Sequence, residues 1–281
     1  MKNIDIIFFE GDGNSSRVSK LLSASLKNSK TRILDAATLL KTGGYFDGSS
    51  ALIGLVFPLY SGSPPSTVKM FLDQSRNLTS KHFFIVVLNP LPFKVFSQSA
   101  SVVTKCIDKK KGNVVALFNI VIPFSGVPDY SAEFLDKVEN CILERVSRIS
   151  NIIEKARSAP LTLTIIGRIL TIACSLMYKI MKIYGLKLFV RSSCDSCGLC
   201  IRGCPVSAIE MDRGIKFKNH CVLCMRCVNA CPQEAIGTKR LTRFFKEPSI
   251  QSVDSFDNRK NHKITGLIEN LSKAYFENDQ Y

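Results

Sequence analysis

The sequence predicts an α/β fold, a doubly wound parallel sheet, followed by a small α+β domain organised around cysteines. Two observations carry this prediction. Across positions 1–158, short apolar runs alternate with stretches of helical periodicity. Between positions 191 and 240, eight of the eleven cysteines lie in two runs of identical spacing. A chain of 281 residues is long enough for two such domains.

The apolar runs of the first domain predict its strands. Each run is short, rich in Ile, Val, Leu and Phe, and shows little alternation, as expected of strands buried on both faces. Alternation of strands with helices indicates a parallel sheet, and five strands favour the order 2-1-3-4-5 with ligand sites at the carboxyl ends. The expected strands are 4–9, 52–57, 83–88 and 114–118, with a weaker one at 32–34, and the expected helices are 16–26, 66–76, 97–109 and 131–157.

The loop after the first expected strand has the backbone features of an anion site. Two glycines precede a helix N-terminus, whose free N–H groups favour an anion. On these residues the first domain resembles flavodoxin, in which this loop cradles the phosphate of FMN. The resemblance implies an FMN site made of Gly11, Gly13, Asn14, Ser15 and Ser16, with Tyr60 from a later loop stacking on the isoalloxazine ring.

Two positions of the loop depart from the flavodoxin pattern. Glu10 and Asp12 stand where that family places hydroxyl side chains. A carboxylate about 4 Å from a phosphate costs on the order of 4 kcal/mol near a protein surface. We therefore expect weak FMN binding or none.

The two cysteine runs predict iron–sulfur clusters. Each reads Cys-x2-Cys-x2-Cys-x3-Cys-Pro, and the second repeats the first in register, so one unit is used twice. In such runs the fourth cysteine ligates the other cluster. We expect one [4Fe–4S] cluster on Cys194, Cys197, Cys200 and Cys231, and a second on Cys221, Cys224, Cys227 and Cys204.

Zinc and disulfides explain the cysteines less well. A structural zinc ion needs only four ligands, so a third cysteine in each run would have no role. Disulfides need an oxidising compartment, and positions 1–10 carry no secretory pattern. We therefore expect reduced thiolates and a cytoplasmic location.

The segment 191–240 resembles the bacterial-type two-cluster ferredoxins, because Pro-x-x-Ala-Ile closes both runs. The whole chain resembles the flavodoxin–ferredoxin fusion proteins of anaerobic microbes. The resemblance implies one-electron transfer and an apolar shell around the clusters. The candidates for that shell are Val206, Ile209, Ile215, Phe217, Val222, Val228 and Ile236.

The division that we expect is a flavodoxin-like domain at 1–158, a linker helix at 159–190, a ferredoxin domain at 191–240 and a polar tail at 241–281. The linker contains an apolar stretch at 161–186 that is interrupted by Arg168, Lys179 and Lys182. Apolar residues recur in it every three or four positions, which predicts an amphipathic helix. We expect its apolar face to dock on one of the two domains. Peripheral membrane contact through this stretch is the alternative.

The formal net charge of +15 favours acidic redox partners. No DNA or RNA motif is present, so we expect no nucleic-acid partner. Three functions stay open. The chain is an electron-transfer protein with a flavin beside its clusters, a flavin-free ferredoxin whose first domain docks a redox partner, or an iron–sulfur regulator that binds an acidic partner. Whether it is a simple carrier or an oxidoreductase component is not decided by the sequence.

Overall fold

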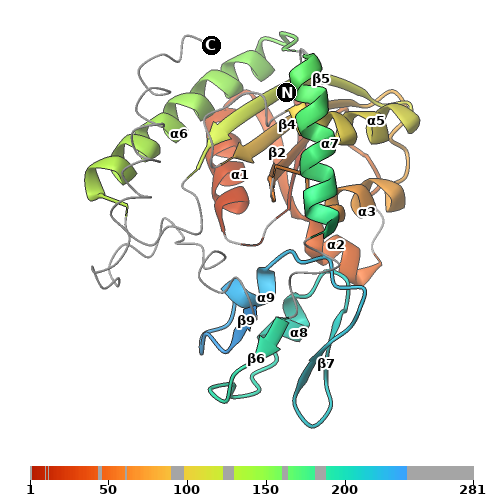
Figure 1. Cartoon of the computed structure of the whole chain (residues 1–281). Helices are drawn as coiled ribbons and strands as arrows, with labels where there is room; N and C mark the ends of the chain where they lie inside the picture. The colour runs from red at the N-terminus through yellow and green to blue at the C-terminus, as the bar shows by residue number, and fades with distance from the viewer. Residues whose placement is uncertain are drawn as a thin grey trace.

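The computed structural model describes residues 2–9, 11, 13–43, 46–60, 62–89, 98–122, 130–159, 164–180 and 188–238. Glu10, Asp12 and the tail at 241–281 therefore lie outside the described residues, as does the part of the linker that contains Lys182. Figure 1 shows the first domain above and the cysteine-rich domain below it.

The first domain is built on a five-stranded sheet in which every neighbouring pair is parallel. Its order is β2-β1-β3-β4-β5, which is the flavodoxin-like doubly wound order. The predicted fold class and strand order are confirmed. The strands are β1 (Lys2–Phe8), β2 (Ser29–Asp35), β3 (Leu52–Pro58), β4 (His82–Asn89) and β5 (Asn113–Val121).

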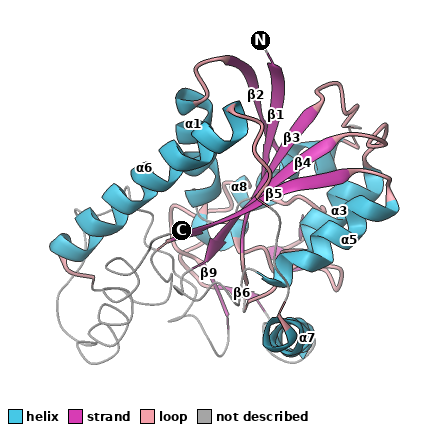
Figure 2. Ribbon diagram, turned by 90° about the horizontal axis from the view of Figure 1, so that it is seen from above, coloured by secondary structure: helices cyan, strands magenta, loops and turns pink. Residues whose placement is uncertain are grey.

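Helices cover both faces of this sheet (Figure 2). The helices α1 (Asn14–Ser25) and α6 (Ala132–Glu154) enclose one apolar core. On the other face, α3 (Ser66–Gln74) and α5 (Ser101–Lys109) enclose a second core, and the short 3-10 helix η1 (Gln98–Ala100) precedes α5. Burial on both faces explains why the strands read as apolar runs without alternation.

One helix of the first domain has no counterpart in the sequence prediction. The seven-residue helix α2 (Ala36–Thr42) follows β2 directly. Its N-terminus is capped by Asp35, whose side chain accepts a hydrogen bond from the Ala37 N–H at 2.9 Å. The helix begins at the carboxyl end of β2, so Asp35 stands at the edge of the sheet where ligands bind in this fold.

The linker forms the helix α7 (Ile165–Ile180), which packs on η1. The expectation that its apolar face docks on a domain is wrong, because that face is exposed. The side that contacts η1 is small and polar: Gly167 is buried there, and the Thr164 N–H donates to the Gln98 side-chain oxygen at 2.9 Å. Among the described helices, none has the length and hydropathy to span a bilayer.

The cysteine-rich domain contains two small antiparallel sheets and two short helices. One sheet pairs the first strand of the domain with its last, and the other is a hairpin. The elements are β6 (Leu188–Val190), α8 (Leu199–Gly203), β7 (Ile209–Met211), β8 (Ile215–Phe217), α9 (Arg226–Asn229) and β9 (Ile236–Thr238).

Candidate metal centre

The sequence repeat of the cysteine runs is also a repeat of backbone conformation. In the first run, Ser196 and Gly198 on either side of Cys197 have φ values of 59° and 72°. In the second run, Leu223 and Met225 on either side of Cys224 have φ values of 53° and 57°. Non-glycine residues adopt positive φ rarely, so two bulky residues in this conformation mark a loop whose shape is imposed. Both loops wrap their three cysteines in the same way.

The fourth cysteine of each run is oriented by a backbone N–H group. Ala208 N–H donates to Cys204 Sγ at 3.2 Å, and Ala235 N–H donates to Cys231 Sγ at 3.3 Å. The two bonds occupy equivalent positions of the two runs. Donors that point at ligand sulfurs are one of the means by which a protein tunes an iron–sulfur cluster.

One cavity of the domain is lined by four cysteines from both runs. Cys204 comes from the first run, and Cys221, Cys224 and Cys227 come from the second. This is the grouping expected if the fourth cysteine of one run completes the site of the other. No three His, Cys, Asp or Glu side chains in the described part of the chain converge as they would on a single metal ion.

Burial raises the pKa of two thiols in this cavity. The pKa of Cys224 rises to about 11, first because of burial and also because Cys204 and Cys221 lie near. The pKa of Cys227 is also raised, first because of burial and then because Cys224 and Cys221 lie near. A ligand must be a thiolate, so the positive charge of bound iron is what would deprotonate these groups.

Apolar side chains close around the cysteines. Of the residues that the sequence suggests for this shell, Val222, Ile209 and Ile236 are buried. The others are half-buried and contact the same cluster: Val206, Ile215, Phe217 and Val228. The four cysteines of the cavity therefore lie in apolar, donor-bearing surroundings that suit an iron–sulfur cluster, whereas Cys197 of the other set is exposed.

The loop of the second run rests on the first domain, at the carboxyl edge of the sheet. Tyr60 O–H donates to the Cys224 carbonyl at 3.2 Å, and the Asn229 side-chain amide donates to the Gly11 carbonyl at 2.6 Å. A carbon added to Gly11 would lie 2.3 Å from the Cys224 carbonyl oxygen. Glycine is therefore required here for close approach of two backbones.

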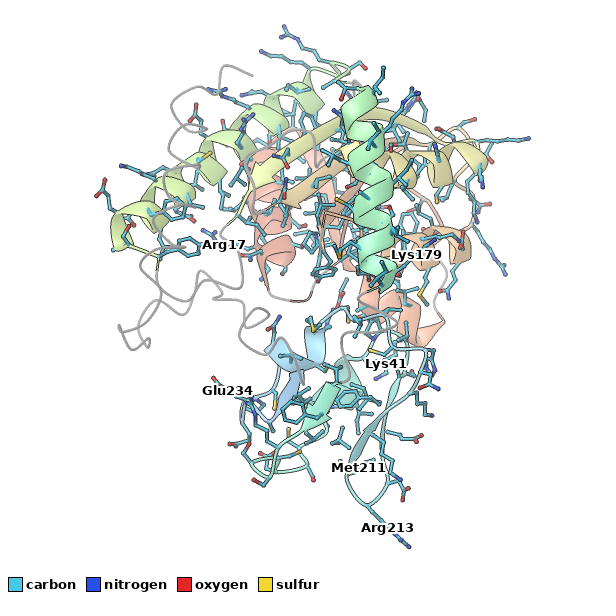
Figure 3. The ribbon with its side chains drawn as sticks, in the orientation of Figure 1. Arg17, Lys41, Lys179, Met211, Arg213 and Glu234 are labelled. Atoms are coloured by element: carbon cyan, nitrogen blue, oxygen red, sulfur yellow. The ribbon has the colours of Figure 1, made fainter. Side chains whose placement is uncertain are left out.

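Charged contacts lie beside this contact between the Cys224 loop and the first domain. Arg226 donates to both carboxylate oxygens of Asp35, at 3.1 and 2.7 Å. Lys41, at the end of α2, donates to the carbonyls of Ile201 and Arg202 at 3.0 and 2.6 Å. These carbonyls belong to the end of α8, where a cation is favourable. Figure 3 labels Lys41 at the junction of the two domains.

Of the residues predicted to bind FMN, Gly11 and Tyr60 are brought together, and both contact the loop of the second run. Ser15 lies on the same buried face of α1 as the core residues Val18 and Leu22. Tyr60, expected to stack on the ring, is engaged by Cys224. The Cys224 carbonyl lies directly against Gly11.

Four residues of the docking contact are absent from the sequence prediction: Asp35, Lys41, Arg226 and Asn229. Asp35 could have been suspected from the sequence, because it follows an expected strand at the carboxyl edge of the sheet. Arg226 is far from Asp35 along the chain, and nothing in the sequence pairs the two.

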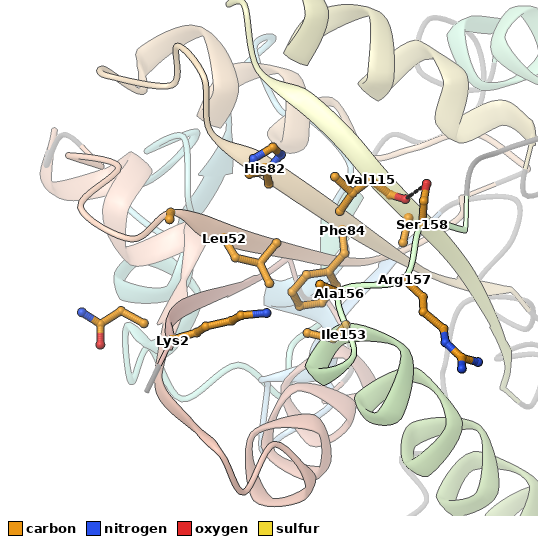
Figure 4. Close-up of a pocket in the computed structure, with 12 residues that line it drawn as sticks. Lys2, Leu52, His82, Phe84, Val115, Ile153, Ala156, Arg157 and Ser158 are labelled. Atoms are coloured by element: carbon orange, nitrogen blue, oxygen red, sulfur yellow. Dashed lines mark hydrogen bonds between the residues drawn. The ribbon is translucent and has the colours of Figure 1, made fainter.

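A second cavity of about 410 Å³ lies at the opposite edge of the sheet, where the strands begin (Figure 4). Leu52, Phe84 and Ile153 form its apolar wall, and Lys2 and Arg157 stand at its margin. The described residues that line it include no Cys, Asp or Glu, and none of the predicted site residues is among them.

The second domain matches a known family. Residues 193–236 match the family model of the 4Fe-4S dicluster domain. No curated protein matches the chain. The family match covers the two cysteine runs and assigns iron–sulfur electron transfer to the second domain.

Several solved structures similar to the chain are flavodoxins. A Streptococcus pneumoniae flavodoxin has 12% identity and a TM-score of 0.38, and the alignment covers 55% of this chain and 99% of that one. Flavodoxin 1 from Bacillus cereus has 15% identity, a TM-score of 0.38, and coverage of 56% and 99%. A Fusobacterium nucleatum flavodoxin mutant bound to flavin mononucleotide has 15% identity, a TM-score of 0.40, and coverage of 56% and 98%.

Similarity at this level carries no functional argument, and the fold assignment rests on the strand order. The chain joins a domain of flavodoxin-like fold to a 4Fe-4S dicluster domain, as in flavodoxin–ferredoxin fusion proteins.

Proposed function

We propose that this protein is an electron carrier with two [4Fe–4S] clusters, whose flavodoxin-like domain serves as a docking platform for its own ferredoxin domain instead of binding FMN. The observation that supports the proposal is the close contact of the Cys224 carbonyl with Gly11 and Tyr60. In a fold that binds ligands at the carboxyl edge of the sheet, the chain fills that edge with its own backbone.

When bound, each cluster supplies one-electron transfer. The ligands that we assign are Cys194, Cys197, Cys200 and Cys231 for one cluster, and Cys221, Cys224, Cys227 and Cys204 for the other. The cavity lined by the second set supports this crossed assignment. The chain's own contribution is to orient the sulfurs by backbone N–H groups and to surround the second set with apolar side chains.

The platform gives the small domain a support that its own core does not. Domains of this size bury a modest apolar core and usually rely on metals or other partners for stability. Here the support consists of the Asp35–Arg226 ion pair, the Lys41 bonds and the backbone contact at Gly11. Each contact connects the two domains at the loop of the second run or at the end of α8.

The test is anaerobic purification with iron, acid-labile sulfide and flavin measured per chain. We expect about eight iron and eight sulfide per chain, from two four-iron clusters, and flavin far below one per chain. Added FMN should bind weakly or not at all, and reduction by dithionite should be followed by one-electron transfer to an artificial acceptor.

Tight, stoichiometric FMN on the full chain would overturn the platform proposal. An iron content of about half the expected value would overturn the two-cluster assignment. As a matched comparison, Glu10→Ser with Asp12→Thr restores the hydroxyl pattern of flavodoxins without touching Gly11. If packing against Cys224 is what blocks the site, this variant should gain little FMN affinity.

A further inference from the structure

The helix α7 presents its apolar side to solvent. Its exposed residues form a continuous stripe at helical spacing, and the exposed fractions of Ile165, Ile169 and Ile172 are 77%, 62% and 70%. Leu176, Met177 and Ile180 continue the stripe to the end of the helix, each more than two-fifths exposed. Figure 2 looks along α7 and shows it at the periphery of the molecule, beside the first domain. Contiguous exposed apolar surface of this kind marks an interaction site.

Polar contacts at both ends fix which side of α7 faces outwards. At its start, Gln98 bonds to the backbone N–H and the hydroxyl of Thr164, and a carbon added to Gly167 would clash with the Gln98 side chain at 1.7 Å. Near its end, Tyr178 O–H donates to the Val222 carbonyl at 3.0 Å. The helix cannot roll its isoleucines inwards without breaking these bonds, so the stripe is a stable surface of the folded chain.

The charges on α7 point to an anionic occupant. Arg168 and Lys179 are both exposed, and because about three helical turns separate them, they lie along the same edge of the stripe. The helix contains no Asp or Glu. The chain as a whole carries a formal charge of +15. An apolar face with a cationic border is the pattern of helices that lie in the interface of anionic membranes.

The same charges disfavour pairing with a second copy. A two-fold interface between two α7 helices brings the same patch of both chains together. In an antiparallel pair, Arg168 of one copy would face Lys179 of the other, with no acidic residue of α7 to compensate. The 16 residues of α7 that the structure describes extend about 24 Å, short of the hydrocarbon core of about 30 Å.

We propose that α7 is a peripheral membrane-binding helix that lies on anionic lipid surfaces. Its isoleucine stripe enters the acyl boundary, and Arg168 and Lys179 contact the headgroups. The proposal does not depend on FMN or on the number of clusters, so its failure and that of the proposed function are separable.

The test is flotation of the full, cluster-loaded protein with vesicles of phosphatidylglycerol and phosphatidylcholine, and with vesicles of phosphatidylcholine alone. We expect binding to the mixed vesicles to exceed binding to neutral vesicles by about thirtyfold, since each of two cations contributes about fivefold. Arg168→Gln with Lys179→Gln should remove most of that difference.

The stripe is tested by Ile169→Glu with Ile172→Glu, two changes at exposed positions that leave the core intact. We expect at least about tenfold weaker binding to both kinds of vesicle. The matched control is Leu143→Glu, an exposed apolar residue on α6, which should bind like the unmodified chain. Iron content is measured for every variant to establish that the second domain is loaded.

Two outcomes would overturn the proposal. One is failure of the unmodified chain to bind anionic vesicles. The other is a dimer in sedimentation that the Ile169→Glu, Ile172→Glu variant converts to monomer, since this would assign the stripe to a second copy.

Discussion

Arg226 and Asp35 form the best-defined ionic contact between the two domains, and each also has a local role. Arg226 is the first residue of α9, directly after the loop that packs against Gly11. Asp35 caps α2 with the same carboxylate that accepts the two bonds from Arg226. Both side chains are half-buried, and the two parallel bonds fix the geometry of the pair.

Arg226→Met should weaken the attachment of the second domain by about 1.5–3 kcal/mol, the usual contribution of hydrogen bonds to charged groups. The measurement is the guanidinium midpoint for loss of the iron–sulfur absorbance. Arg213→Met is the control, because Arg213 is exposed at the tip of the β7–β8 hairpin and points away from the first domain (Figure 3). The control should leave the midpoint unchanged.

Asp35→Asn completes a double-mutant cycle with Arg226→Met. Asparagine keeps the helix cap and removes the charge. The double variant should lose little more than either single variant, since both remove the same pair. Additive losses would mean that the two residues do not act together.

The cavity that Cys204 shares with the second cysteine run predicts crossed ligation. Cys204→Ala should damage the cluster on Cys221, Cys224 and Cys227, because Cys204 lines the same cavity as these three. Cys231→Ala is the equivalent change in the second run and should damage the cluster on Cys194, Cys197 and Cys200. Each variant should lose about half of its iron.

Electron paramagnetic resonance of the reduced protein separates the two sites. Loss in Cys204→Ala of the signal that disappears in Cys194→Ala, with the other signal intact, would contradict the crossed assignment.

Some elements could be read from the sequence and others could not, for identifiable reasons. The central strands are buried on both faces, so their sequences are apolar runs, and these runs predict the strands. The edge strand β2 alternates in exposure and is longer than the predicted 32–34. The helix α2 is a seven-residue element that depends on the cap from Asp35. Short elements without periodicity leave no pattern to recognise.

The candidate site also has residues that the sequence reveals and residues that it does not. Cysteine spacing encodes local loop geometry, so the metal-binding residues are visible in the sequence. Docking depends on contacts between segments far apart in the chain, such as Gly11 with Cys224, which no local pattern records. For α7, periodicity identified the residues of one face but not whether that face is covered, because this depends on how Gln98 holds the opposite side.

The chain as a whole carries many more cations than anions, which predicts electrostatically steered association with acidic redox partners. The association rate with an acidic electron carrier should fall by about tenfold or more between low salt and about 0.15 M ionic strength, where charges are screened over about 8 Å. Stopped-flow mixing at several salt concentrations measures this. A rate independent of salt would contradict the prediction, and an uncharged acceptor such as a quinone analogue provides the control.

The platform at the carboxyl edge of the sheet also implies an order of assembly. Every residue that it contributes, from Gly11 to Tyr60, is synthesised long before Cys221, the first cysteine of the second run. Domains generally fold as units, with the N-terminal one first during synthesis. The sheet is therefore complete when the cysteines leave the ribosome, and the loop around Cys224 meets a finished surface. Cluster insertion then becomes the last step of maturation, carried out on a chain whose remainder is already folded.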